Sequence, residues 1–198
     1  MSSESSISEL LSTARTHLTS LNGTGQFQID ILINNAGVAR NGTLGNITIQ
    51  DYEYVFHINV LGPLLVMQAV LPFLPHDRSG RIVNVSSISS SAAFVGQSVY
   101  GASKAAVEGF TRTWARELAE RGTVNAVNPG PVKTDMWGGL TEEFRRDMSP
   151  WVRMAPLMAV REEDRQDGIG DAKGLGGRPA ASSEIAGVVG MLCSEESG

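Results

Sequence analysis

A tyrosine and a lysine stand four residues apart in VYGASKAAVEGF, residues 99–110. In a helix, residues four apart share one face, so Tyr100 and Lys104 would lie one turn from each other. One cation at ~4 Å, in an effective dielectric of ~20, contributes on the order of 4 kcal/mol, enough to lower the pKa of a phenol by about three units. Tyr100 could then exchange a proton with a carbonyl or hydroxyl oxygen. The alternative interpretation is an exposed pair at the start of a helix.

The elements that would position this pair follow from the spacing of apolar residues. Helical spacing recurs in four segments, residues 6–22, 48–74, 98–120 and 183–192. Thr48 is the expected N-cap of the second helix, with Asp51 three residues on. Gly62 and Pro63 should bend this helix, because proline lacks a backbone N–H.

Short apolar runs rich in β-branched residues predict buried strands between these helices, at residues 29–33, 81–85 and 124–127. Strands that alternate with helices of this length predict right-handed crossovers and a parallel sheet. The expected fold is therefore α/β, a partial Rossmann-like, doubly wound parallel sheet flanked by helices. No linker divides residues 1–198, so we expect one domain, in which residues 134–181 form a flexible lid over the substrate.

Composition excludes several classes of partner. The formal net charge is −5 and the pI is about 5.2, so no basic field is available for a nucleic acid or an anionic membrane. No apolar run reaches the ~18 residues of a membrane span, and the amino terminus does not resemble a secretory signal. Cys193 is the only cysteine, and no histidine is paired with a carboxylate at ligand spacing. We expect a cytoplasmic protein without a metal that acts on a small molecule, which the aromatic and methionine content of residues 137–158 suggests is apolar.

Five motifs, in the right order, resemble the short-chain dehydrogenase/reductase family. They are ILINNAG (31–37), HINVLGP (57–63), RIVNVSS (81–87), YGASKAAV (100–107) and VNAVNPGPVKTDM (124–136). The resemblance implies an oxidoreductase that moves a hydride between NADP(H) or NAD(H) and a carbonyl or secondary alcohol.

The resemblance also implies a role for each residue of the catalytic site. Tyr100 exchanges the proton, Lys104 lowers the tyrosine pKa and holds the nicotinamide ribose, and Asn59 anchors a water in a proton relay. The family serine lies about thirteen residues before the tyrosine, which favours Ser87 as the hydroxyl that orients the substrate oxygen, with Ser86 as the fallback.

Cofactor contacts are implied at the ends of two strands. Besides Tyr100 and Lys104, the matching positions are Asn35, Ala36, Gly37, Val132 and Thr134. His57 matches no catalytic role in the family, and structural packing is favoured for it.

Two segments of the family pattern are not found. The glycine-rich TGxxxGxG turn that binds the pyrophosphate, with its helix, has no counterpart here, and neither does the family's last strand. The resemblance therefore implies a chain shortened at both ends, whose strand at residues 29–33 becomes an unprotected apolar edge open to self-association as a homo-oligomer. Two alternatives follow, a cofactor-independent isomerase, dehydratase or cyclase, and a non-catalytic remnant that pairs with a full-length relative.

Overall fold

The computed structural model describes residues 4–22, 26–153 and 178–197. The chain divides into two compact units, one formed by Met1–Val127 with Met191–Gly198 and the other by Asn128–Gly190. The single domain expected over residues 1–198 stays a prediction.

The first unit is built on a parallel sheet of three strands in the order β1-β2-β3. The strands are β1 (Ile31–Asn34), β2 (Gly80–Val85) and β3 (Gly122–Val127). Their parallel pairing, with Ile31 opposite Arg81 and Gly80 opposite Gly122, confirms the α/β prediction. β2 and β3 begin at a close approach, since a Cβ on Gly122 would overlap the Gly80 carbonyl.

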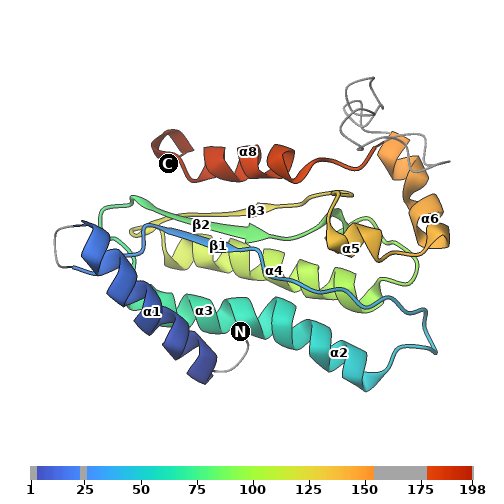
Figure 1. Cartoon of the computed structure of the whole chain (residues 1–198), viewed down its shortest axis with the longest axis horizontal. Helices are drawn as coiled ribbons and strands as arrows, with labels where there is room; N and C mark the ends of the chain where they lie inside the picture. Colours follow the sequence, from blue (N-terminus) through green and yellow to red (C-terminus); the bar gives the residue numbers. More distant parts are fainter. Residues whose placement is uncertain (1–3, 23–25, 154–177, 198) are drawn as a thin grey trace. The chain divides into compact units, whose positions relative to one another are not determined.

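Helices of the first unit cover one side of this sheet (Figure 1). They are α1 (Glu4–Asn22), α2 (Ile49–Phe56), α3 (Gly62–Val70) and α4 (Ser98–Glu117), of which α4 contacts β2 and β3 directly. The buried cluster between helices and sheet comprises Met67, Val70, Leu74, Ile82, Trp114, Leu118 and Val124. Burial of these side chains fixes α4, and with it the tyrosine and lysine, against the central strand.

The second predicted helix is interrupted in the middle. It begins at the expected cap, where the Asp51 N–H donates to Thr48 Oγ1 at 3.1 Å. Between α2 and α3 it becomes a π-helix, His57–Leu61, in which the Gly62 N–H reaches the His57 carbonyl. The predicted bend takes this form because Pro63 cannot donate to the carbonyl four residues earlier, that of Asn59.

This helical stretch is also apolar enough to cross a membrane by length and composition, since Ile49–Phe73 has a mean hydropathy of 1.6. One such helix is weak evidence of a span, because the core helix of a soluble protein passes the same test. Here Met67 and Val70 belong to the buried cluster, and Asn59 is only 1% exposed.

β1 lies at an edge of the sheet and pairs with β2 alone among the described residues. Leu32 packs against the buried cluster, whereas Ile31 and Ile33, on the other face, are 48% and 45% exposed. The prediction of an apolar edge strand is confirmed for the part of the chain that the structure describes.

The second unit contains α5 (Asp135–Gly138), α6 (Glu142–Arg153) and most of α8 (Ser182–Leu192). An isolated bridge joins Val132 to Ala180, and the buried Arg178 forms a salt bridge with Glu184 at 2.7 Å. The larger part of the expected lid, residues 154–177, lies outside the described residues, so the lid stays a prediction.

Candidate active site

Tyr100 and Lys104 are buried together in the first two turns of α4. Their side chains are 8% and 5% exposed, which rules out the alternative of an exposed pair. Lys104 Nζ lies 5.9 Å from the centroid of the Tyr100 ring and donates a 2.7 Å hydrogen bond to the Val85 carbonyl at the end of β2. The helix therefore brings phenol and amine to the carboxyl end of the central strand, where parallel sheets bind ligands.

Burial perturbs both groups. It raises the pKa of Tyr100, and the hydrogen bond with Ser87 opposes that rise only in part. Burial also lowers the pKa of Lys104 to about 8. The expectation that Lys104 brings the tyrosine toward neutrality is wrong for this structure, because removal of the phenol from water outweighs the effect of its neighbours. At neutral pH, Tyr100 is therefore a protonated phenol.

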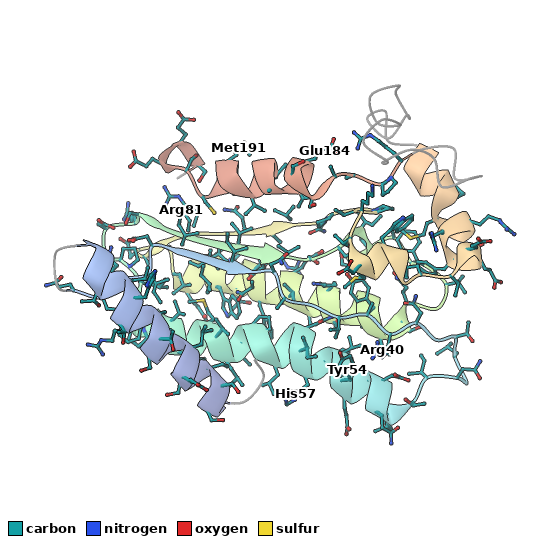
Figure 2. The ribbon with its side chains drawn as sticks, in the orientation of Figure 1. Arg40, Tyr54, His57, Arg81, Glu184 and Met191 are labelled. Carbon is teal, nitrogen blue, oxygen red and sulfur yellow. The ribbon has the colours of Figure 1, made fainter. Side chains whose placement is uncertain are left out.

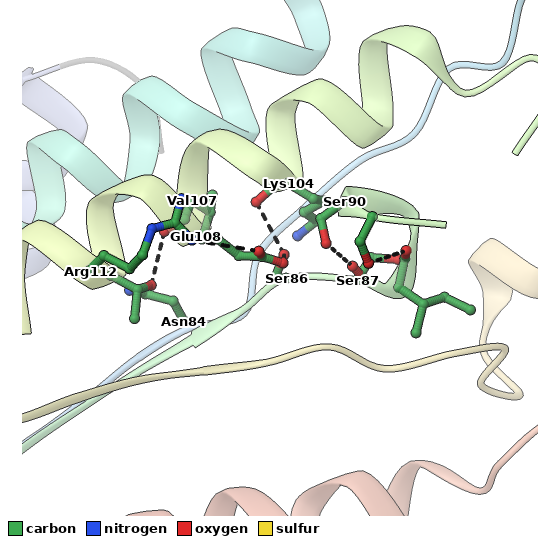
Figure 3. Close-up of polar contacts among 11 residues, drawn as sticks. Asn84, Ser86, Ser87, Ser90, Lys104, Val107, Glu108 and Arg112 are labelled. Carbon is green, nitrogen blue, oxygen red and sulfur yellow. Dashed lines mark hydrogen bonds and ion pairs between the residues drawn. The ribbon is translucent and has the colours of Figure 1, made fainter. Parts of the chain in front are cut away.

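The two adjacent serines have different environments. Ser87 lies at the start of a 3-10 turn, Ile88–Ser90, where its hydroxyl accepts the Ser89 N–H and donates to Ser89 Oγ, each at 3.2 Å. It also lies close enough to the Tyr100 phenol to lower the pKa of that group. The Ser86 hydroxyl contacts the Lys104 carbonyl and Glu108 Oε1, each at 3.1 Å (Figure 3). Ser87 therefore stands beside the tyrosine, whereas Ser86 ties the strand end to the following turn of α4.

The Asn59 side chain joins three segments around the site. Its Oδ1 accepts the Val38 N–H at 2.8 Å, and its Nδ2 donates to the Val38 carbonyl at 2.9 Å and to Ser103 Oγ at 3.0 Å. Ser103 in turn donates to the Tyr100 carbonyl at 2.7 Å. Both amide hydrogens are thus used within the protein, so Asn59 fixes the segment after β1 to the turn that carries Tyr100.

The segment after β1 approaches Lys104 at a glycine. A Cβ on Gly37 would stand 3.2 Å from Lys104 Nζ and 3.4 Å from Asn59 Oδ1, so a larger residue here would crowd the lysine ammonium. An ammonium has three hydrogens, and the one protein acceptor of Lys104 among the described residues is the Val85 carbonyl. The two other N–H donors of Lys104 therefore fit a ligand with hydroxyl groups, such as the ribose of a nicotinamide cofactor. They lie beside Gly37, which follows the exposed Asn35 and Ala36.

The expected cofactor contacts Val132 and Thr134 belong to the second compact unit, Asn128–Gly190. There Thr134 Oγ1 donates to the Val132 carbonyl at 3.3 Å. Their contact with a nicotinamide stays a prediction.

His57 is exposed on the outer side of its helix, near the stacked pair of Arg40 and Tyr54 (Figure 2). The packing role expected for His57 is therefore wrong, because its side chain is exposed to solvent. Within the described residues no group of three His, Cys, Asp or Glu side chains could hold a metal ion.

Sequence reasoning missed two residues that shape the site. Glu108, which contacts Ser86, follows Lys104 by four residues, so its place on the same helix face was visible in the spacing. Val38 binds Asn59 only through its backbone groups, and no side-chain pattern could have indicated that contact.

Comparison with known proteins gives a consistent result. The family model described as "short chain dehydrogenase" matches residues 1–144. The chain is 54% identical over 192 residues to L-xylo-3-hexulose reductase of Hypocrea jecorina, covering 89% of this chain and 63% of that protein. It is 49% identical over 207 residues to L-xylulose reductase of Aspergillus niger, covering 96% and 69%. With 3-oxoacyl-[acyl-carrier-protein] reductase of Synechocystis it shares 38% identity over 156 residues, 78% and 60% of the two chains. The chain thus spans about two thirds of the length of these relatives.

Proposed function

Because the chain belongs to the short-chain dehydrogenase family, we propose that it is a reductase that moves a hydride from NADPH or NADH to the carbonyl carbon of a small ketone. All three relatives described above are named reductases. The observation that carries the proposal is the burial of Tyr100 and Lys104 next to each other on α4, with Ser87 close enough to the phenol to lower its pKa.

Reduction needs a proton on the substrate oxygen as the carbon accepts hydride, and the cofactor supplies that hydride when bound. Burial raises the pKa of Tyr100, so at neutral pH the phenol holds the proton that the oxygen requires. Ser87, which lies beside the phenol and now donates to Ser89 Oγ, would turn its hydroxyl to the same substrate oxygen and orient it with a second hydrogen bond. In the reverse direction Tyr100 must first lose its proton, so alcohol oxidation requires a higher pH.

Lys104 and Asn59 support this step in different ways. Besides its bond to the Val85 carbonyl, the Lys104 ammonium has two further donors, which would hold the ribose hydroxyls of the cofactor and stabilise charge near Tyr100. The amide of Asn59 is used within the protein, but its backbone carbonyl lacks an α-helical donor because the fourth residue after it is Pro63. That carbonyl is the group through which Asn59 would hold a water that returns a proton to the site.

The names of the two fungal relatives favour a keto-sugar as the substrate, a polar molecule, over the apolar one that the composition of residues 137–158 suggested. NADP and NAD are both retained as cofactors, because no described residue distinguishes them. A homo-oligomer formed through exposed surface of the first unit is retained as part of the proposal.

A pair of tyrosine variants tests this function. In Tyr100→Phe we expect NADPH oxidation with L-xylulose to fall by about 10²- to 10⁴-fold, since the proton donor is lost. Tyr52→Phe is the matched control, because that tyrosine is 45% exposed and stacks on Phe56 away from the site. Equal activity of Tyr100→Phe and the control would refute the proposed mechanism.

A further inference from the structure

A second buried serine in the loop after β2 contacts the hydroxyl of Ser87. Ser89 is 9% exposed, and its Oγ accepts a hydrogen bond from Ser87 Oγ at 3.2 Å. Its backbone N–H donates to the same Ser87 oxygen, also at 3.2 Å. Among the described residues no other group hydrogen-bonds Ser89 Oγ. The side chain and the N–H of Ser89 therefore both contact one atom, Ser87 Oγ.

The other two serines of this loop bond backbone groups instead. Ser90 Oγ donates to the Ser87 carbonyl at 2.7 Å (Figure 3), and the exposed Ser91 donates to the Ile88 carbonyl at 3.4 Å. These two bonds close the 3-10 turn, and neither involves the Ser87 hydroxyl. Ser89 therefore differs from its neighbours in its contact and not in its residue type.

A close approach to α4 fixes this loop beside the catalytic tyrosine. A Cβ on Gly101 would stand 2.6 Å from the Ser89 carbonyl oxygen, so a larger residue there would displace the loop backbone. Gly101 is the residue that follows Tyr100, and Ser87 lies close enough to the phenol to lower its pKa. The pair of Ser87 and Ser89 is therefore held against the turn of α4 that carries Tyr100.

We propose that Ser89 is a positioning residue of the reduction, whose hydroxyl reverses its hydrogen bond with Ser87 and so directs the Ser87 hydrogen to the substrate oxygen. This inference rests on the proposed function. A hydroxyl donates one hydrogen, accepts through two lone pairs, and rotates to suit its neighbours. When the Ser87 hydrogen turns from Ser89 Oγ to the substrate, the Ser89 hydrogen turns to Ser87 Oγ. Each hydrogen stays on its own oxygen, and Ser89 acts on the substrate only through Ser87.

The reversed bond strengthens the donor that faces the substrate. Ser87 Oγ then accepts both the N–H and the O–H of Ser89 and donates one bond to the substrate oxygen. Hydrogen bonds in such a chain polarise one another, so the Ser87 hydroxyl becomes a stronger donor than it would be alone. Loss of the Ser89 hydroxyl should therefore weaken the effect of Ser87 without removing it.

The kinetic test compares Ser89→Ala with wild type in the full chain, with NADPH and L-xylulose. Because the reversed bond forms only while Ser87 holds the reacting oxygen, kcat and kcat/KM should both fall about 3- to 10-fold, with KM changed less than about twofold. Ser91→Ala is the matched control and should keep wild-type kinetics, because that serine is exposed and donates to the Ile88 carbonyl. In a Ser87→Ala background, Ser89→Ala should add less than about a twofold loss. Equal losses in both backgrounds would overturn the inference.

Two variants of similar shape separate the hydroxyl of Ser89 from its packing. Ser89→Thr keeps the hydroxyl and Ser89→Val replaces it by a methyl group, so any crowding by the added atoms is common to both. We expect kcat for Ser89→Thr to be at least about threefold higher than for Ser89→Val. Equal kcat values, with both variants melting near the wild-type temperature, would overturn the inference. If both variants unfold, the cycle with Ser89→Ala decides.

Failure of the proposed function gives a different pattern. If the wild type does not reduce L-xylulose with NADPH or NADH, the reductase proposal fails, and titration of the Tyr100 phenol without substrate decides the role of Ser89. In a Tyr52→Phe, Tyr54→Phe background Tyr100 is the only tyrosine, so ultraviolet absorbance follows its ionisation. Ser87 lowers the pKa of this phenol, so Ser89→Ala should raise it by weakening that donor. A pKa that Ser89→Ala leaves unchanged or lowers refutes the inference.

Discussion

Replacement of Lys104 by methionine should make the protein more stable at neutral pH while it removes activity. Burial lowers the pKa of Lys104 from 10.5 to about 8, and the difference between these values, at ~1.4 kcal/mol per pKa unit, corresponds to about 3 kcal/mol. The variant also loses the hydrogen bond from Nζ to the Val85 carbonyl, which lowers its free energy of unfolding by about 1 kcal/mol at every pH. At pH 7 the net gain in the free energy of unfolding is therefore about 2 kcal/mol.

The gain in stability of Lys104→Met over the wild type should decrease as the pH rises. Below pH 8 the lysine is charged in both states, so the wild type bears the full cost of burying it. Between about pH 8 and 10.5 the folded protein holds a neutral amine while the unfolded chain still binds a proton, so wild-type stability rises relative to the variant. Above this window the cost is gone, and Lys104→Met should be about 1 kcal/mol less stable than the wild type.

Urea unfolding at a series of pH values from 6.5 to 10.5 measures this difference. Lys133→Met is the control for loss of one lysine, because Lys133 is exposed in the folded protein. The reasoning is refuted if the difference between Lys104→Met and wild type is the same at every pH, or if the variant is less stable at pH 7.

Three further outcomes follow from the site. Ser86→Ala should keep kcat/KM within about threefold of the wild type and lower the free energy of unfolding by about 1 kcal/mol. Ser87→Ala should lower kcat/KM at least about 10²-fold. If a steady-state assay finds the larger loss in Ser86→Ala, the roles of the two serines are exchanged. Asn59→Ala removes three buried hydrogen bonds, so we expect calorimetry to show a loss of about 2–4 kcal/mol, and a loss under 1 kcal/mol would contradict its linking role. Because burial lowers the pKa of Lys104 to about 8, the rate of ketone reduction should decline above that pH, and a Lys104→Arg variant should shift the decline upward.

Local patterns were sufficient for the order and type of the main elements. Apolar β-branched runs correctly predicted three parallel strands, and the cap at Thr48 follows from a side chain that bonds a backbone N–H three residues away. The one-turn spacing of Tyr100 and Lys104 was equally local. Each of these features depends on neighbours within a few residues, which the sequence displays directly.

Contacts between distant segments could not be predicted in the same way. The π-helix at His57–Leu61 was expected only as a bend, because the spacing around Pro63 does not reveal which carbonyls find new donors. The direction of the Tyr100 pKa change was wrong because the calculation counted a cation at ~4 Å and omitted desolvation by the surrounding fold. The partners of Asn59 are backbone groups of Val38, which no residue pattern marks.

The most direct test of the central claim, that Tyr100 and Ser87 act together on one substrate oxygen, is a double-mutant cycle in kcat/KM for NADPH-dependent reduction of L-xylulose. Tyr100→Phe, Ser87→Ala and the double variant are compared with wild type at pH 7. Residues that act as a unit give a double variant about as impaired as the worse single variant. Losses that multiply, or single variants that retain wild-type rates, would contradict the account.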